Sequence, residues 1–107
     1  MAERAEQGTA SVDVSVMDPL RPLVTIVGEL DIASVQAVKE GIEPYLTGVP
    51  AQVVFDLGGL EFMDSSGIAM LVQISNQVGA VQIRDATPIV RRVIELTGLD
   101  GIFGLAN

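Results

Sequence analysis

The fold class follows from residues 52–77, which read QVVFDLGGLEFMDSSGIAMLVQISNQ. Residues 52–56 form a short apolar run rich in β-branched side chains, which is typical of a central strand buried on both faces. Residues 57–64 are interpreted as a loop, and residues 66–77 as a helix that Gly79 ends. This helix would turn four side chains toward the core: Ile68, Leu71, Val72 and Ser75. A strand that leads through a loop into a helix indicates an α/β fold.

Two further strands precede this stretch. Residues 12–16 alternate valine with polar side chains, which is the period-2 pattern of a half-buried strand. Residues 18–22 carry the turn signals Asp-Pro and Arg-Pro, and residues 23–27 form a second apolar run that Gly28 would end. The short connection predicts an antiparallel hairpin.

A helix is predicted between the hairpin and the central strand. It would span about residues 32–45, with Asp31 able to cap its first turn. Its apolar face would consist of Val35, Val38 and Ile42.

The last part of the chain predicts a fourth strand over residues 80–84 and a third helix. Thr87 followed by Pro88 is a favoured helix start, and Gly98 is a good C-cap. The helix would run to about Leu96 and bury Ile89, Val90, Val93 and Leu96. The tail would dock through Ile102, Phe103 and Leu105.

The predicted order is therefore β-β-α-β-α-β-α in one domain of residues 11–107, after a flexible segment of residues 1–10. Strands joined through a helix pair in parallel, whereas the hairpin is antiparallel. We therefore expect a mixed four-stranded sheet with helices packed on it.

Composition excludes several function classes. The chain of 107 residues has no cysteine, so it has no thiol to attack a substrate or bind a metal. It also has no histidine, which is the commonest general base and metal ligand. Its net charge of −8 argues against nucleic acid and against an anionic membrane as partners. No apolar stretch has the length of a signal peptide or of a membrane span, so we expect a cytoplasmic protein.

The polar sequence at the start of the second helix, Asp64-Ser65-Ser66-Gly67, is the candidate functional site. The first N–H groups of a helix lack intrahelical partners, so one of these residues is expected to act as the N-cap. Taken alone, the pattern favours capping over any further role for the two serines.

Three enzymatic interpretations can be compared. A Ser-His-Asp triad is impossible without histidine. A serine–lysine dyad would require Lys39, the only lysine, to approach Ser65. Asp31, Asp56 and Asp64 would resemble a Mg²⁺ site, but no phosphate-binding loop accompanies them. We therefore expect no enzyme activity, catalytic residue, cofactor or metal site.

Three motifs in order resemble the anti-sigma-factor antagonists, which are bacterial STAS-domain proteins. They are Asp64–Gly67 at a helix start, Gly28–Asp31 after the second strand, and residues 90–100, VRRVIELTGLD. The resemblance covers the chain from about Val12 to Leu105. The chain departs from the family pattern in two places. The helix after Ser65 is about one turn shorter than is usual in the family. The stretch Ile32-Ala33-Ser34 stands where members of the family more often have polar residues.

The resemblance implies a partner-switching mechanism. The unphosphorylated protein would bind an anti-sigma factor that is also a serine kinase, and would thereby release a sigma factor. Phosphorylation of the first serine after the aspartate, Ser65 here, would block binding, and a separate serine phosphatase would restore it. Asp31 and Asp64 match acidic positions beside that serine, and Ser66 and Gly67 complete the motif.

The helix after Ser65 is expected to supply part of the partner surface. If Ile68 and Leu71 face inward, Met70 and Ile74 lie nearer the outside and would form an apolar contact patch. The alternative is that both belong to the core under a neighbouring segment, since methionine adapts to either role.

Two rival functions remain at this point. One is an accessory subunit of a lipid ABC transporter, in which a STAS fold binds the ATPase constitutively and Ser65 is only a cap. The other is a small hydrolase or phosphotransferase, which the missing histidine, cysteine and phosphate loop disfavour.

Overall fold

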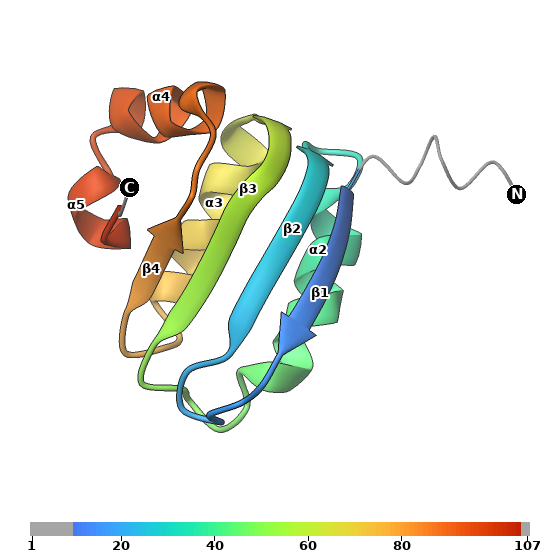
Figure 1. Cartoon of the computed structure of the whole chain (residues 1–107), viewed down its shortest axis with the longest axis vertical. Helices are drawn as coiled ribbons and strands as arrows, with labels where there is room; N and C mark the ends of the chain where they lie inside the picture. The colour runs from blue at the N-terminus through green and yellow to red at the C-terminus, as the bar shows by residue number, and fades with distance from the viewer. Residues whose placement is uncertain (1–9, 106–107) are drawn as a thin grey trace, which may run out of the picture.

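A four-stranded sheet in the order β1-β2-β3-β4 organises the structure, a computed structural model that describes residues 10–105. The strands are β1 (Ala10–Ser15), β2 (Leu23–Leu30), β3 (Val53–Met63) and β4 (Val81–Arg84). β1 pairs with β2 in antiparallel fashion, whereas β2 with β3 and β3 with β4 pair in parallel. The predicted mixed sheet with an N-terminal hairpin is confirmed (Figure 1).

Helices cover one face and one end of this sheet (Figure 1). They are α2 (Val35–Ile42), the 3-10 helix η1 (Glu43–Tyr45), α3 (Ser65–Ser75), α4 (Pro88–Thr97) and α5 (Asp100–Phe103). α2 and α3 lie side by side behind the strands, α4 packs against β3, and α5 packs against β4. No helix within residues 10–105 covers the opposite face of the sheet (Figure 1).

The core lies between the sheet and the α2–α3 layer. In β2 the buried side chains alternate as the period-2 pattern requires, with Val24 and Ile26 fully buried and Thr25 between them on the open face. β3 contributes Phe55, which is among the largest fully buried side chains, and α3 contributes Leu71. Burying a side chain of this size contributes roughly 1.5–3 kcal/mol, so the valine-, leucine- and isoleucine-rich composition suffices without tryptophan.

β2 and β3 are both longer than predicted. β2 continues through Gly28, which adopts a φ of 104° beside a register shift, and ends at Leu30. The interpretation of residues 57–64 as a loop was wrong, because β3 continues to Met63. The Gly58-Gly59 pair resembles a turn locally, yet Gly59 pairs with Val27 of β2. Long-range pairing therefore overrides the local turn signal.

The helix boundaries also differ in places from the prediction. α2 begins at Val35 rather than at residue 32, and gives way to η1 where Pro44 occurs. α3 begins at Ser65 and ends at Ser75, two residues before the predicted end. At α4 the predicted start is confirmed: Thr87 Oγ1 accepts a hydrogen bond from the Val90 N–H, and Pro88 follows the cap.

The buried face of α4 was predicted correctly for Val90 and Val93 but not for Ile89 and Leu96. Val90 and Ile94 are fully buried, whereas Ile89 and Leu96 are exposed by 59% and 70%. The helix therefore contacts the body through a narrow i, i+4 stripe. In the tail, Phe103 is buried as expected, but Ile102 is exposed.

The tail also reaches the edge of the sheet. Leu105 forms a parallel β-bridge with Ile83 of β4, and the Ile83 N–H donates to the Gly104 carbonyl at 3.4 Å. This contact covers part of the β4 edge. At the other end of the chain, Ala10 is the first residue of β1, and the predicted flexible segment otherwise lies outside the described residues.

Candidate functional site

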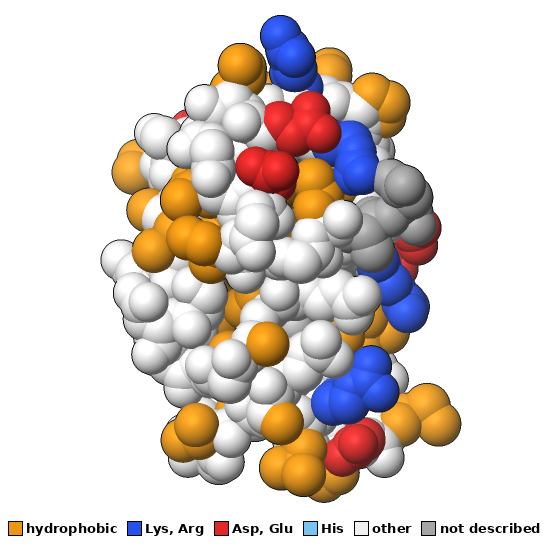
Figure 2. All heavy atoms as spheres, turned by 90° about the vertical axis from the view of Figure 1, so that its left-hand side faces the viewer, with side chains coloured by type: hydrophobic (Ala, Val, Ile, Leu, Met, Phe, Trp, Pro, Cys, Tyr) orange, Lys and Arg blue, Asp and Glu red, His pale blue; other side chains and the backbone are white. Residues whose placement is uncertain are grey.

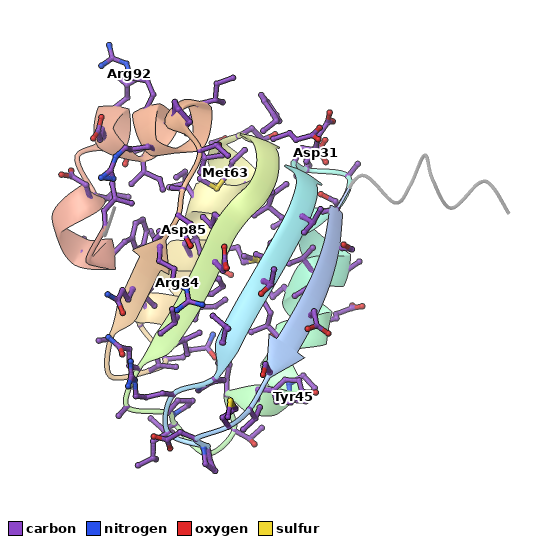
Figure 3. All side chains as sticks on the ribbon, in the orientation of Figure 1. Asp31, Tyr45, Met63, Arg84, Asp85 and Arg92 are labelled. Atoms are coloured by element: carbon purple, nitrogen blue, oxygen red, sulfur yellow. The ribbon has the colours of Figure 1, made fainter. Side chains whose placement is uncertain are left out.

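The motif residues gather where β2 and β3 end. Because these strands are parallel, their carboxyl ends meet at one edge of the sheet, and Leu30 pairs with Met63. The Asp64 N–H donates to the Leu30 carbonyl at 3.2 Å, so the segment after β3 is tied to the end of β2. Figure 3 shows Asp31 and Met63 at this same end of the two strands.

Asp64 is the N-cap of α3. It has extended backbone angles, and its carboxylate accepts a hydrogen bond from the Ser66 N–H at 2.8 Å. Capping therefore does not need the hydroxyl of Ser65. That side chain is exposed, and its hydroxyl makes no hydrogen bond to any of residues 10–105. Among the described residues, Ser65 thus presents an exposed hydroxyl in the first turn of α3 that the cap does not require.

Asp31 and Ser34 hold the turn between β2 and α2. The Asp31 carboxylate accepts hydrogen bonds from the Ala33 and Ser34 N–H groups at 3.0 and 3.1 Å. The Ser34 hydroxyl donates to the Glu29 carbonyl at 2.8 Å, and only 3% of the residue remains exposed. Asp31 therefore caps this turn, and Ser34 is structural.

Gly67 allows the first turn of α3 to approach the sheet closely. A Cβ atom at this position would lie 2.5 Å from Met63 Cγ and 3.0 Å from Leu30 Cδ2. Gly67 is itself buried. Its contribution to the site is close packing beneath Ser65.

Met70 and Ile74 were predicted to form an exposed contact patch, and that prediction was wrong. Their exposed fractions are only 2% and 0%. α3 is buried on two sides because the sheet covers one and α2 covers the other. The exposed ridge of α3 consists instead of Ser65, Ala69 and Gln73.

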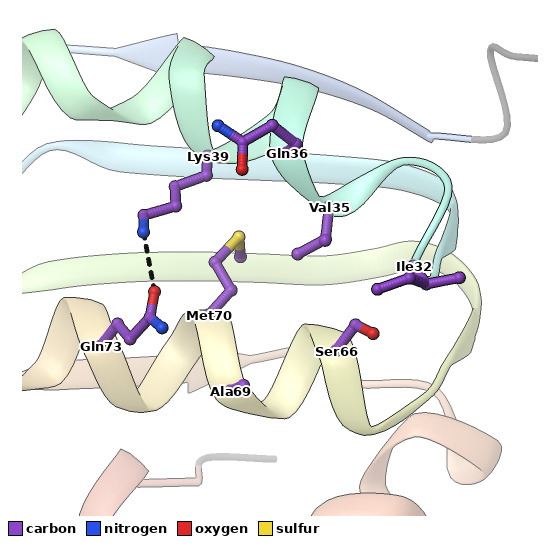
Figure 4. A pocket seen from close by; sticks show the side chains of 8 residues that line it. All are labelled: Ile32, Val35, Gln36, Lys39, Ser66, Ala69, Met70 and Gln73. Atoms are coloured by element: carbon purple, nitrogen blue, oxygen red, sulfur yellow. Dashed lines mark hydrogen bonds between the residues drawn. The ribbon is translucent and has the colours of Figure 1, made fainter.

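A hollow of about 270 Å³ lies between α2 and α3. Figure 4 shows its lining residues, which are Ile32, Val35, Gln36, Lys39, Ser66, Ala69, Met70 and Gln73. Lys39 Nζ donates a hydrogen bond to Gln73 Oε1 at 2.8 Å across its far end. The hollow was not predicted, although Ile32, Val35 and Lys39 recur at the i, i+3, i+7 spacing of one helix face.

The acidic residues of the hypothetical Mg²⁺ site are not brought together. Asp56 lies on the open face of the sheet, 3.9 Å from Arg84 Nε, and accepts a hydrogen bond from the Gly58 N–H. Along β3 it is eight residues from Asp64, or roughly 25 Å at the usual rise of a strand. No group of three or more acidic side chains within residues 10–105 is placed to hold a metal ion.

Lys39 is also distant from Ser65. It meets α3 at Gln73, eight residues beyond Ser65, which is about 12 Å at the rise of an α-helix. The structure therefore does not form the serine–lysine dyad.

Charge is distributed unevenly around the molecule. Glu29, Asp31, Glu61 and Asp64 flank the end of the sheet where Ser65 lies. On the face that carries α4, α5 and the β4 edge, basic side chains lie apart and alternate with acidic ones, without forming a continuous patch (Figure 2). None of the helices within residues 10–105 has the length and apolar composition that crossing a bilayer requires.

Comparison with known proteins identifies the family. The family model of the STAS domain matches residues 12–107. The anti-sigma-F factor antagonist RsfB of Mycobacterium tuberculosis is 34% identical over 101 residues, which covers 89% of this chain and 81% of RsfB.

Solved structures agree with this result. A crystal structure of an anti-sigma factor antagonist from Mycobacterium paratuberculosis superposes with a TM-score of 0.81 at 29% identity, covering 90% of this chain and 84% of that one. The phosphorylated form of SpoIIAA from Bacillus has the same fold, with a TM-score of 0.70 at 20% identity over 91% and 92% of the two chains. The chain therefore belongs to the STAS domain family and, within it, to the anti-sigma-factor antagonists.

Proposed function

We propose that this protein binds an anti-sigma factor while Ser65 is unphosphorylated, and that phosphorylation of Ser65 by that partner ends the binding. The observation that carries this proposal is that Asp64, and not Ser65, caps the start of α3. Asp64 caps the helix, which leaves the Ser65 hydroxyl exposed and without a hydrogen-bond partner among residues 10–105. A kinase can therefore modify Ser65 without breaking a native contact.

The first turn of α3 is suited to carry a phosphate. A phosphate adds about −1.5 to −2 charges at pH 7. Helix N-termini have N–H groups without intrahelical partners and the positive end of the helix dipole, so they tolerate such a charge. We therefore expect phosphorylation to change the surface and to leave the core intact.

The partner surface would respond strongly to the same charge. Asp31 and Asp64 are already acidic and only partly exposed, so a phosphate beside them concentrates negative charge at one spot. A partner surface that fits the unmodified serine would have to accommodate both the volume and the charge. A loss of about 3 kcal/mol would weaken the affinity more than a hundredfold.

We assign the contact surface to Asp31, Asp64, Ser65 and Ser66. Ile74 and Gly67 are not part of it, because both are buried. Met70 is also buried, and it borders the surface only where it lines the hollow between α2 and α3.

The relatives support the proposal in their names. RsfB is described as an anti-sigma-F factor antagonist, and SpoIIAA has been solved in unphosphorylated and phosphorylated forms. A serine phosphatase would be needed to reverse the modification. The rival function, an accessory subunit of a lipid transporter, is not favoured by these named relatives.

Phosphate transfer to purified wild-type chain tests the assignment. The chain is incubated with ATP and each anti-sigma factor kinase of its source organism, and the products are analysed by intact-mass and peptide mass spectrometry. We expect one phosphate on the wild type, none on Ser65→Ala, and one on the matched control Ser66→Ala. A phosphate that persists on Ser65→Ala, or a wild type that no kinase modifies, would contradict the proposal.

A further inference from the structure

The hollow between α2 and α3 has properties that the phosphorylation site does not use. Its volume of about 270 Å³ is below the range of roughly 300–1,000 Å³ that is typical of pockets for cofactors and drug-sized ligands. It is therefore suited to one or two side chains of a protein partner.

One end of the hollow is apolar. Ile32 lies at its mouth and is 77% exposed. Val35 lies beside it, and the buried Met70 lies between the two helices (Figure 4). A partner side chain that enters here would remove Ile32 from water, and the flexible Met70 can adapt to its shape.

The other end is cationic. Lys39 is the only basic residue between Glu29 and Asp64, a stretch with seven acidic residues. Its ammonium group bonds to the neutral Gln73 amide and forms no ion pair with a carboxylate of residues 10–105. Glu40, the adjacent acid, is engaged by the Gln36 amide at 3.1 Å. The Lys39 ammonium group therefore has two further donors for an acceptor from outside.

The hollow is continuous with the surface around Ser65. Ser66, the next residue, lines the hollow, and Gln73 marks its far end about two turns along α3. A partner that covers Ser65 and follows α3 for roughly 12 Å would reach Lys39.

We propose that this hollow determines partner specificity by accepting one aliphatic side chain against Ile32 and one carboxylate on Lys39. The occupant is the anti-sigma factor of the proposed function, on which this inference rests. Charge complementarity identifies the chemistry at the far end of the hollow: the partner presents a single acidic side chain toward Lys39. An antagonist of the same fold that lacks this aliphatic and cationic pair would prefer a different anti-sigma factor.

The test measures the affinity of the full chain for the anti-sigma factor that phosphorylates it, by isothermal titration calorimetry without ATP. The variants are Ile32→Ser, Lys39→Glu and Lys39→Arg. The turn between β1 and β2 offers matched controls: Leu20 is 56% exposed, and Arg21 Nε bonds to the Gln52 amide oxygen at 3.0 Å, as Lys39 does to Gln73. Leu20→Ser and Arg21→Glu therefore repeat both changes away from the hollow.

We expect Ile32→Ser and Lys39→Glu each to weaken binding about tenfold or more, which corresponds to about 1.4 kcal/mol. Lys39→Arg and both controls should remain within about twofold of the wild type. Replacing the partner's matching acid by lysine should restore binding to Lys39→Glu. Circular dichroism verifies that every variant is folded.

Two results would overturn this inference while leaving the proposed function intact. One is that Ile32→Ser and Lys39→Glu both bind the anti-sigma factor with wild-type affinity, while the anti-sigma factor kinase still phosphorylates Ser65 of the wild type in the presence of ATP. The other is a dimer of the chain alone in sedimentation experiments that Lys39→Glu abolishes, because the hollow would then receive a second copy. If no anti-sigma factor binds or phosphorylates the wild type, the proposed function itself fails.

Discussion

At the scale of single residues, two adjacent residues of the Asp64–Gly67 motif have different roles: one caps α3, and the other presents an exposed hydroxyl. Asp64 satisfies the Ser66 N–H and starts α3, whereas Ser65 projects from the first turn without a hydrogen bond to the rest of residues 10–105. This separation allows Ser65 to change its charge while the helix keeps its cap. The consequence is that substitutions at neighbouring positions should affect different properties.

Removing the cap should affect stability. We expect Asp64→Ala to destabilise the chain by about 1 kcal/mol, because the Ser66 N–H loses its acceptor. For a domain of this size that corresponds to a melting temperature lower by roughly 4–8 °C. Asp64→Asn keeps an acceptor and should melt close to the wild type. Equal melting temperatures for the alanine variant and the wild type would show that the cap does not stabilise α3.

At the scale of elements, the position of Ser65 depends on how closely α3 approaches the ends of β2 and β3. Gly67 sets this distance, because Met63 and Leu30 occupy the space that a Cβ atom would need. Both neighbours are fully buried core residues, so neither can move into solvent. The helix start and the strand ends therefore form one packed unit.

We expect Gly67→Ala to destabilise the chain by about 1–3 kcal/mol through overpacking. Gly101→Ala is the matched control, since Gly101 is also helical but a Cβ atom there would meet nothing within 4 Å. The control should be neutral or slightly stabilising, because alanine favours helix. Urea denaturation of both variants measures the difference, and equal stabilities would contradict the close-packing argument.

At the scale of the whole molecule, the open face of the sheet, the helical layer and the Ser65 end are distinct surfaces (Figure 1). The core lies between the sheet and α2–α3, and Ser65 is exposed at the margin of that layer. A chain with a net charge of −8 would gain further negative charge on the proposed phosphorylation. The added repulsion would be spread over a surface in water and would not enter the core.

Phosphorylation at Ser65 should therefore leave the fold unchanged. We expect the phosphorylated and unmodified chains to have superimposable far-UV circular dichroism spectra, while the affinity for the anti-sigma factor falls more than a hundredfold. Ser65→Asp should show the same pattern in weaker form, because a carboxylate carries less charge than a phosphate. A loss of helical signal on phosphorylation would instead point to a switch that acts by unfolding α3.

Much of the fold could be predicted because its signals are local. The alternation in residues 12–16, the Thr87-Pro88 helix start and the Gly98 C-cap each depend on backbone preferences within a few residues. The same holds for the motif at Ser65, since an N-cap is defined by its own turn. The sequence by itself therefore determined the order of the main elements, the mixed sheet and the capped start of α3, and the functional site at Ser65 stays a prediction.

Only the tertiary structure decided what each face touches. β3 passes through Gly58-Gly59 because β2 pairs with it there, and Met70 and Ile74 are buried because α2 covers the side of α3 that faces away from the sheet. The hollow at Ile32 and Lys39 arises from the same packing of two helices. Residues distant in the chain supply these contacts, so no local pattern can specify them. The proposed partner surface consequently lies along the α2–α3 groove, beside the serine that the sequence had identified.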